Sequence, residues 1–208
     1  MDSGGLVELA FLKDRVRENI GLLDAVGFTG GEPCLQAVQV TQLCEWANHV
    51  GLKTFLNTNG STPSLIESLS LQGLVDYIAM DVKAPLKADA YGRVTGLRGF
   101  GEEIVTAVKQ TYQALVDAPS FLEVRTTIVP TLIDDEKAVR GIASSVRDCD
   151  LYVLQEYQPV SDVPDPKLRT VRPPKRERLV CLAKSALRAG VKAVAIRTRR
   201  YGFEEVTI

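Results

Sequence analysis

The chain has 208 residues, of which 45% are hydrophobic and 25% are charged, and its formal net charge at pH 7 is −1. Because acidic and basic residues are interspersed, the charge pattern gives no reason to expect nucleic acid or a membrane surface as a partner. No apolar run is long enough to cross a bilayer, and Met1–Gly5 lacks the features of a secretory leader, so we expect a single cytoplasmic domain over residues 1–208.

Segments with helical and with strand-like hydrophobic spacing alternate along the chain. In chain order, the sequence predicts a helix over 6–20, a strand over 25–29, a helix over 35–50, a strand over 53–57, a helix over 62–73, a strand over 77–82, an irregular loop over 84–101, a helix over 102–116, a strand over 121–129, a helix over 134–146, a strand over 151–157, an extended proline-rich connection over 159–174, a helix over 175–189 and a strand over 191–198. Thr62 as N-cap and Pro63 in the first turn mark one helix start.

This alternation predicts an α/β fold with parallel strands and helical crossovers, either an open sheet or all or part of a barrel. The first predicted element is a helix, whereas a (β/α) barrel begins with a strand. Since a crossover helix packs between two parallel strands, we expect a partial TIM-like (β/α) barrel whose first strand is missing. Such a sheet would leave an apolar edge near Ala25 to Phe28.

The segment Val26-Gly27-Phe28-Thr29-Gly30-Gly31-Glu32-Pro33 runs from an apolar strand directly into two glycines, a carboxylate and a proline. Glycine has no Cβ, so a ligand can approach the main chain closely at Gly30 and Gly31. Glu32 adds an acceptor for a cationic group, and Pro33 stops the strand. The segment predicts one wall of a small-molecule site, the alternative being an ordinary turn between a strand and a helix.

Polar residues also follow the later strands, at the end where parallel α/β folds bind their ligands. They are Asn57-Thr58-Asn59-Gly60, Asp81 and Lys83, Arg125 and Thr127, and Gln155-Glu156-Tyr157-Gln158. Each group alone is compatible with a turn or a solvated surface. Together they interrupt successive apolar strands at one end, and a polar ligand would supply the partners that buried charges need.

The four cysteines are Cys34, Cys44, Cys149 and Cys181, and no two of them are closely spaced. This spacing argues against a zinc ribbon, a redox pair or a disulfide framework. Cys44 and Cys181 lie on amphipathic helical patterns and are predicted to be small core residues. Cys34 follows the glycine-rich turn and could face the site, although packing is the simpler role for a lone cysteine.

Five segments of the chain match a known family. They are Gly30-Gly31-Glu32-Pro33, Thr58-Asn59-Gly60, Tyr77-Ile78-Ala79-Met80-Asp81-Val82-Lys83-Ala84-Pro85, Arg125-Thr126-Thr127-Ile128-Val129-Pro130 and Tyr152-Val153-Leu154-Gln155. The chain resembles radical S-adenosylmethionine (SAM) enzymes and, within them, the activating proteins of anaerobic ribonucleoside-triphosphate reductase and related glycyl-radical activases. The first segment is specific to the superfamily, and the third and fourth point to the activases.

The resemblance implies a SAM pocket. Gly30, Gly31 and Glu32, followed by Pro33, would hold the amino group of the methionine part. The ribose and the carboxylate would be surrounded by residues after the second and third strands, namely Asn57, Thr58, Asn59, Asp81 and Lys83. Arg125 and Gln158 would complete the pocket. Asn57 stands where related activases often have aspartate, and Gln158 where some relatives have histidine.

The resemblance also implies a [4Fe–4S] cluster, which is held in the family by a Cys-x-x-x-Cys-x-x-Cys loop after the first strand and cleaves SAM to a 5′-deoxyadenosyl radical. The sequence contains no such loop, so we expect an N-terminally truncated chain that keeps the SAM pocket, has neither metal ligands nor a catalytic residue of its own, and is inactive without the loop. The implied partners are a glycyl-radical protein, such as anaerobic ribonucleoside-triphosphate reductase or a relative, and an electron donor such as flavodoxin or ferredoxin.

Two other functions stay open on the sequence. One is a cluster-less protein that binds SAM or another nucleotide without radical chemistry. The other is an ordinary barrel enzyme that acts on a phosphorylated metabolite, which has less support because no glycine-rich phosphate loop follows the last strands.

Overall fold

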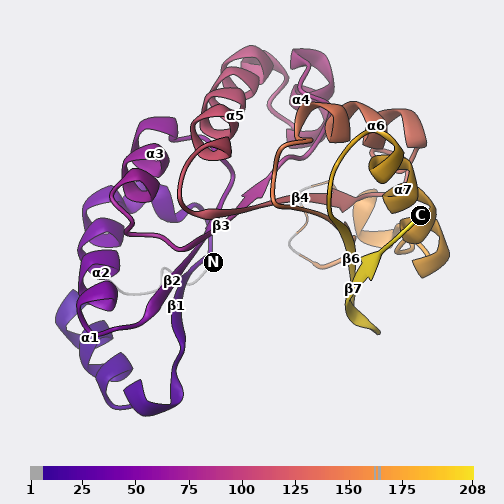
Figure 1. Cartoon of the computed structure of the whole chain (residues 1–208). Helices are drawn as coiled ribbons and strands as arrows, with labels where there is room; N and C mark the ends of the chain where they lie inside the picture. The colour runs from indigo at the N-terminus through magenta and orange to yellow at the C-terminus, as the bar shows by residue number, and fades with distance from the viewer. Residues whose placement is uncertain (1–6, 162, 164) are drawn as a thin grey trace.

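The computed structural model describes residues 7–161, 163 and 165–208. These residues form a seven-stranded sheet in the order β1-β2-β3-β4-β5-β6-β7, which curves into an open half-barrel (Figure 1). Strands β1 to β6 pair in parallel and β7 pairs with β6 in antiparallel fashion. The predicted partial (β/α) barrel is therefore the observed architecture of the described part of the chain.

The strands of this sheet are β1 (Ala25–Phe28), β2 (Lys53–Thr58), β3 (Tyr77–Asp81), β4 (Phe121–Ile128), β5 (Leu151–Glu156), β6 (Val194–Thr198) and β7 (Gly202–Val206). The α-helices are α1 (Leu9–Arg17), α2 (Ala37–His49), α3 (Pro63–Leu71), α4 (Ala88–Thr95), α5 (Gly101–Val116), α6 (Glu136–Ser145) and α7 (Arg176–Arg188). Short 3-10 helices are η1 (Ile20–Leu22), η2 (Pro33–Gln36), η3 (Arg98–Phe100) and η4 (Leu168–Thr170).

The alternating pattern predicted the order of strands and helices correctly up to β6, but two predictions were wrong. The loop expected over 84–101 contains α4 and η3. Its Tyr-Gly and Thr-Gly pairs are typical of turns, yet Gly92 allows close packing, because a Cβ there would lie 2.9 Å from the Cα of Arg98. Strand β7 was not predicted, since its sequence Gly202-Phe203-Glu204-Glu205-Val206 has few apolar residues and lies at the edge of the sheet.

Two details at helix starts also differ from expectation. Leu6, where the first helix was predicted to begin, lies outside the described residues, and the described helix α1 begins at Leu9. Thr62 does precede α3, but its hydroxyl makes no capping hydrogen bond. Pro63 occupies the first turn as predicted, because its fixed φ suits a helix start.

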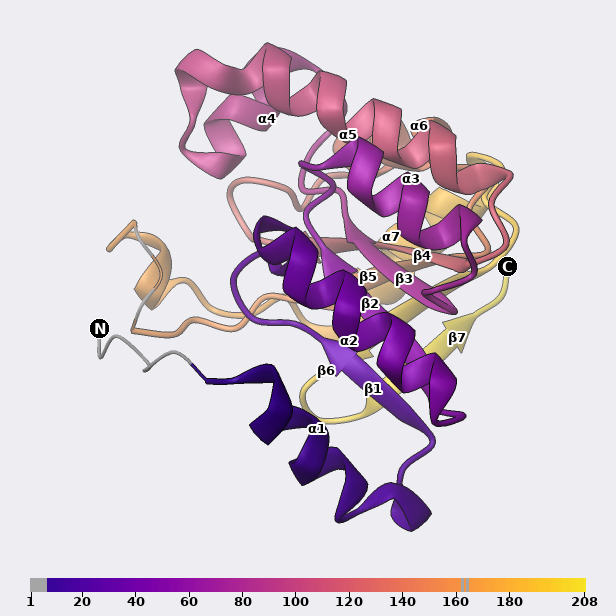
Figure 2. The ribbon, with the colours of Figure 1, turned by 90° about the vertical axis from the view of Figure 1, so that its left-hand side faces the viewer.

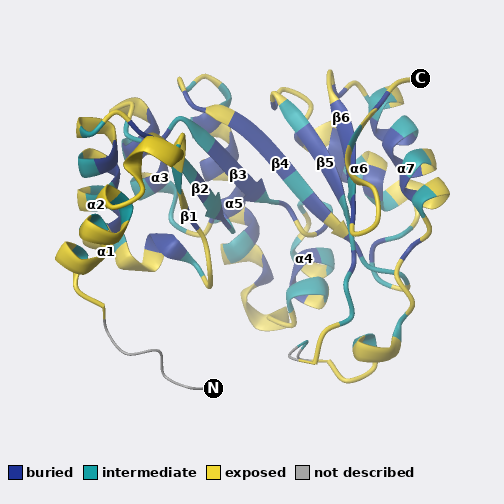
Figure 3. Cartoon of the chain, turned by 90° about the horizontal axis from the view of Figure 1, so that it is seen from below, coloured by how far each residue is buried: buried dark blue, intermediate teal, exposed yellow. Residues whose placement is uncertain are grey.

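The core lies between the sheet and the helices on its convex side. Along each strand alternate side chains point to opposite faces, and the residues that face the helices are almost fully buried, as Leu56, Ile78 and Val124 are on three adjacent strands. Figure 3 shows the continuous band of buried residues along the central strands. The opposite, concave face carries the charged side chains that the sequence places between apolar ones, and it is therefore the face available to a ligand.

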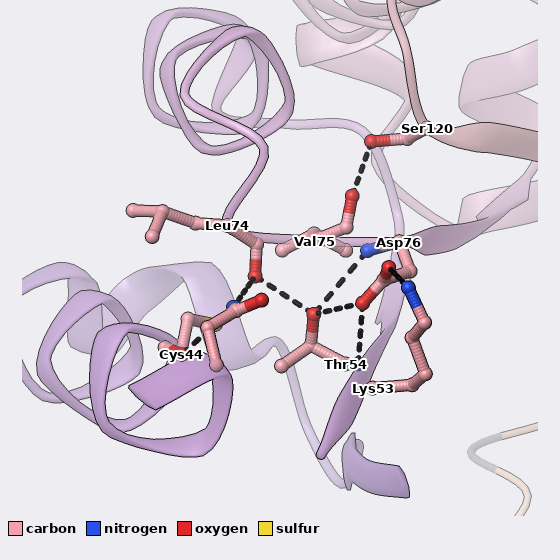
Figure 4. A network of polar contacts seen from close by, with 8 residues as sticks. Cys44, Lys53, Thr54, Leu74, Val75, Asp76 and Ser120 are labelled. Atoms are coloured by element: carbon pink, nitrogen blue, oxygen red, sulfur yellow. Dashed lines mark hydrogen bonds and ion pairs between the residues drawn. The ribbon is translucent and has the colours of Figure 1, made fainter. Parts of the chain in front are cut away.

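At the amino ends of β2 and β3, a network of polar contacts links the residues at the starts of these strands (Figure 4). The carboxylate of Asp76 accepts hydrogen bonds from Nζ of Lys53 at 2.6 Å and from the main-chain nitrogen of Thr54 at 2.9 Å. Ser120 donates to the carbonyl of Val75 at 2.6 Å, and Thr54 donates to the carbonyl of Leu74 at 2.7 Å. Each buried polar group here has a partner, which is the arrangement that stabilises a buried network.

Strand β1 forms one edge of the sheet, as expected for residues 25–28. Helix α1 lies beside it, next to α2 (Figure 2). A groove of about 720 Å³ runs between these elements and is lined in part by Leu12, Val26, Phe28 and Trp46. In the described part of the chain, we find no helix with the length and apolar character that a bilayer crossing requires.

Candidate functional site

A polar cavity of about 270 Å³ lies at the carboxyl ends of strands β1 to β5. Its lining residues are Thr29, Gly30, Gly31, Asn57, Thr58, Asn59, Asp81, Lys83, Arg125 and Gln155. Most of the residues predicted from the strand ends thus come together in one place, because parallel strands present their carboxyl ends at the same edge of a sheet. The structure places Glu32, Pro33 and Gln158 outside the lining.

Thr29 and Gln155 line the cavity, although the resemblance did not assign them to the SAM pocket. Gln155 belongs to the polar group at the end of β5, and it pairs in register with Thr127 and Arg197 on the neighbouring strands. Gln158, which was chosen instead, lies two residues beyond the strand and is half-buried. Strand alternation alone favours Gln155, since it shares the face of Val153, the register partner of Arg125.

The glycine-rich turn after β1 forms one wall of the cavity. Gly30 has a φ of +123°, a conformation that side chains with a Cβ rarely adopt. A Cβ built on Gly31 would have no protein atom within 4 Å, so it would point into open space. The main chain is therefore directly accessible at this wall.

Glu32 joins the glycine-rich turn to the end of β2. Its Oε1 accepts hydrogen bonds from the hydroxyl of Thr58 at 2.9 Å and from the main-chain nitrogen of Cys34 at 3.1 Å. Its Oε2 accepts one from the main-chain nitrogen of Asn59 at 2.7 Å. A carboxylate oxygen has two lone-pair sites, so Oε2 keeps acceptor capacity. Pro33 is buried in the first turn of η2 behind this carboxylate.

A chain of hydrogen bonds crosses the cavity floor from β4 to β1. Nη1 of Arg125 donates to Oδ1 of Asn57 at 2.6 Å, and Nδ2 of Asn57 donates to the hydroxyl of Thr29 at 2.9 Å. The guanidinium carbon of Arg125 also lies 5.5 Å from the ring centroid of Phe55, within the range of a cation–π contact. Arg125 is thus held across two strands.

Asp81 supplies the one carboxylate in the cavity lining. It pairs in register with Arg125 on β4, and its Oδ2 lies 3.7 Å from Nζ of Lys83. Burial raises the pKa of Asp81, and the charges of Lys83 and Arg125 offset only part of that effect. The side chain of Asp81 is 44% exposed, so the carboxylate is accessible to a cationic or hydrogen-bonding ligand group.

Tyr91, on α4, supports the wall that carries Asp81 and Lys83. Its hydroxyl accepts a hydrogen bond from the main-chain nitrogen of Lys83 at 3.2 Å and lies 3.5 Å from the carbonyl oxygen of Asp81. The side chain is 2% exposed, and burial raises its pKa to about 12. At physiological pH the phenol is therefore neutral, and this buried side chain supports the cavity wall from behind.

The cysteines do not contribute to a metal centre in the described residues. Cys34, Cys44 and Cys149 are buried, and burial raises the pKa of Cys34 to about 11. Cys181 is exposed, so its prediction as a core residue was wrong: it lies on the outer part of α7, with Sγ 3.8 Å from Oε1 of Glu136. In residues 7–161, 163 and 165–208, no group of three His, Cys, Asp or Glu side chains could hold a metal ion.

The cavity combines accessible main chain, one carboxylate and two cationic side chains, Lys83 and Arg125. Such a site suits a small zwitterion, whose ammonium or sulfonium group would face Asp81 and the glycine-rich turn while its carboxylate faces the cations. Its volume of about 270 Å³ is close to the lower end of the range for small-molecule pockets. The zwitterionic part of a larger ligand fits here, and the remainder would lie along the concave face.

Comparison with known proteins gives a related protein from an archaeon. A protein described as "Putative glycyl-radical enzyme activating enzyme MJ1227", from Methanocaldococcus jannaschii, is 36% identical over 181 residues, which are 87% of this chain and 73% of that protein. The 7-carboxy-7-deazaguanine synthase of Thermococcus kodakarensis is 35% identical over 68 residues, 33% of this chain and 26% of that protein. No family model matches the chain.

Two solved structures share the fold. A radical SAM methyltransferase from Sphaerobacter thermophilus matches with a TM-score of 0.69 at 17% identity, over 92% of this chain and 57% of that one. Archaeal TYW1 matches with a TM-score of 0.62 at 18% identity, over 90% of this chain and 62% of that one. The chain thus spans about three fifths of these structures. Identity and coverage against the archaeal protein show that the chain belongs to the family of that putative glycyl-radical enzyme activating enzyme, and the solved structures show that it has the fold of a radical SAM methyltransferase.

Proposed function

We propose that the cavity at the carboxyl ends of β1 to β5 binds the methionine part of SAM. The observation that carries this proposal is the lining itself, which places two cations and one carboxylate around an accessible glycine main chain. SAM has a carboxylate, an ammonium and a sulfonium group close together, and each finds a complementary partner in this set. The resemblance of the chain to radical SAM enzymes and the fold that it shares with a radical SAM methyltransferase support the same ligand.

The residues take the following parts in the proposal. The turn at Gly30 and Gly31 approaches the amino group, and the free acceptor capacity of Glu32 lies behind that turn. Arg125 and Lys83 bind the carboxylate. Asp81 lies between the sulfonium group, whose charge it complements, and the ribose, which extends along the loop that follows β2 and carries Asn57, Thr58 and Asn59. Pro33 acts only by shaping the turn, and Gln158 is the predicted residue with the least support.

We further propose that the whole enzyme of which this SAM site is a part is a glycyl-radical activase. In that family a [4Fe–4S] cluster supplies the electron that cleaves SAM. The described residues do not offer a ligand set for such a cluster, and we therefore assign this chain the binding and orientation of SAM and no redox step. The proposed partners are a glycyl-radical protein, such as anaerobic ribonucleoside-triphosphate reductase or a relative, and flavodoxin or ferredoxin as electron donor.

A second candidate function is the binding of SAM or another nucleotide without radical chemistry. The observation that favours it is the same absence of a cluster ligand set in the described residues. Cluster reconstitution tests the point that both functions share, which is that this chain holds no cluster. A four-iron species bound stoichiometrically after anaerobic reconstitution with iron and sulfide would contradict the assignment of this chain to SAM binding alone.

Isothermal titration calorimetry with SAM tests the proposed site directly. We expect one SAM bound per chain, and weaker binding of 5′-methylthioadenosine, which lacks the amino acid part. ATP serves as the comparison ligand for a general nucleotide site. No measurable heat with SAM would overturn the proposal, and tighter binding of ATP than of SAM would favour a different nucleotide.

A further inference from the structure

Glu123 is a buried carboxylate on the concave face of the sheet that takes no part in the proposed contacts with SAM. It lies on β4 two residues before Arg125, so both side chains are on the same face of the strand. Its side chain is 1% exposed. Burying a carboxylate so far from water costs free energy unless the carboxylate is paired and hydrogen-bonded. The partners of Glu123 therefore bear on its role.

Three side chains from three strands converge on Glu123. The hydroxyl of Tyr77 donates a hydrogen bond to Oε2, and Nε of Arg125 donates one to Oε1. Nη2 of Arg197 lies 3.7 Å from Oε1. Burial and the hydrogen bond to Glu123 raise the pKa of Tyr77, so its phenol stays protonated and donates at neutral pH.

These contacts determine how Arg125 is oriented. Its guanidinium is planar, with the Nε and Nη1 groups bonded to Glu123 and Asn57 on separate strands, and its face lies on Phe55. Among the described residues, Nη2 has no hydrogen-bond partner. Since the side chain is 11% exposed and lines the cavity, its unused N–H groups are available there to a ligand.

We infer that Glu123 is a positioning residue, which fixes the guanidinium of Arg125 so that its Nη2 edge is presented to the carboxylate of the ligand. This inference rests on the proposed SAM site. Tyr77 contributes by occupying the second oxygen of Glu123, so that the carboxylate cannot rotate away from Nε of Arg125. The ligand then meets a pre-oriented cation and does not have to order a flexible side chain.

The alternative is a role for Glu123 in folding alone. A double-mutant cycle separates the two roles, because residues that act through one another give non-additive effects. The variants of the full chain are Glu123→Gln, Arg125→Gln and the double variant, measured by calorimetry with SAM. The control is Glu204→Gln, which removes a carboxylate on β7 that is hydrogen-bonded to Arg176 on α7, and neither residue lines the cavity.

We expect Glu123→Gln to weaken SAM binding about 10-fold, and the double variant to bind SAM no more weakly than Arg125→Gln alone. Glu204→Gln is expected to bind like the wild type. The inference is overturned if Glu123→Gln binds SAM normally, or if its effect persists in full in the Arg125→Gln background. Failure of the wild type to bind SAM would remove the proposed site and this inference together, and is thereby distinguishable from either result.

A second measurement decides the matter if Arg125→Gln does not fold, as judged by circular dichroism. The carboxylate that Arg125 would bind is absent from 5′-methylthioadenosine. If Glu123 acts through Arg125, Glu123→Gln weakens SAM binding and leaves the affinity for 5′-methylthioadenosine unchanged. Equal weakening for both ligands would show a general loss of structure and overturn the inference.

Discussion

The two ends of strand β3 carry aspartates in opposite environments. Asp76, just before the strand, accepts hydrogen bonds from Lys53 and Thr54. Burial alone would raise the pKa of Asp76, but these bonds and the charge of Lys53 outweigh it and lower the pKa. Asp81, at the other end, has a raised pKa because burial dominates. The amino end thus has its polar groups satisfied within the protein, whereas the side chain of Asp81 at the carboxyl end is 44% exposed and open to a ligand, as a binding site requires.

The largest expected effect is on ligand binding at the carboxyl end. Asp81→Asn removes the one carboxylate of the cavity lining, and we expect SAM binding to weaken by about 10- to 100-fold, the usual cost of one hydrogen bond to a charged group. Because the pKa of Asp81 is raised, the ionised group does not stabilise the fold, so urea unfolding at pH 7 should show no loss of stability. A large loss of stability with unchanged SAM binding in Asp81→Asn would contradict the difference between the two ends of β3.

At the amino end we expect the opposite pair of effects. Asp76→Ala leaves the buried main-chain nitrogen of Thr54 without its acceptor, which should lower the free energy of unfolding by about 1–3 kcal/mol. SAM affinity should stay unchanged, because Asp76 does not line the cavity. Urea unfolding and calorimetry on the same sample provide both values. An equal loss of stability in Asp81→Asn would remove the distinction between the two ends.

The pH dependence of stability follows from the pKa of Asp76. Its folded-state pKa is lowered, so it contributes stability at pH values above its unfolded pKa, about 3.9, and that contribution is lost as the pH falls through the folded-state value. The stability difference between the wild type and Asp76→Asn should therefore shrink as the pH falls below about 4. Urea unfolding between roughly pH 3 and pH 7 measures this stability difference. A difference that grows on acidification would show that the pKa shift has the opposite sign.

Tyr91 links the carboxyl end to α4 and should have a moderate effect. Tyr91→Phe removes the hydrogen bond to the main chain of Lys83, which we expect to weaken SAM binding by roughly 3- to 10-fold, a typical net value for one hydrogen bond. Tyr112→Phe is the matched control, since that hydroxyl bonds the main chain of Asp148, and neither residue lines the cavity. Similar affinity losses in both variants would point to a general loosening of the fold.

The smallest expected effect concerns two glutamines near β5. Gln155 lines the cavity and Gln158 does not. Gln155→Ala should weaken SAM binding by roughly 2- to 5-fold, about one neutral hydrogen bond, while Gln158→Ala should bind SAM like the wild type. Calorimetry on the two variants decides whether the site follows strand alternation or the family alignment. The reverse result would restore Gln158 as a site residue.

The sequence alone determined the order of the parallel strands and the polar residues at their carboxyl ends, because both depend on local hydrophobic spacing. It therefore predicted that Gly30, Asp81 and Arg125 would lie together. Only the tertiary structure decided that part of the segment expected to be a loop folds into α4, and that Glu32 accepts hydrogen bonds from residues at the end of β2. These features depend on contacts between segments far apart in the chain.

Glu123 shows the same limit most clearly. Its position two residues before Arg125 is visible in the sequence, and so is the shared face of the strand. Its burial is not, since that needs Tyr77 from β3 and Arg197 from β6 on either side. A charged residue in an apolar strand is recognisable locally, but whether it meets solvent, a ligand or a buried partner is decided by which strands become its neighbours.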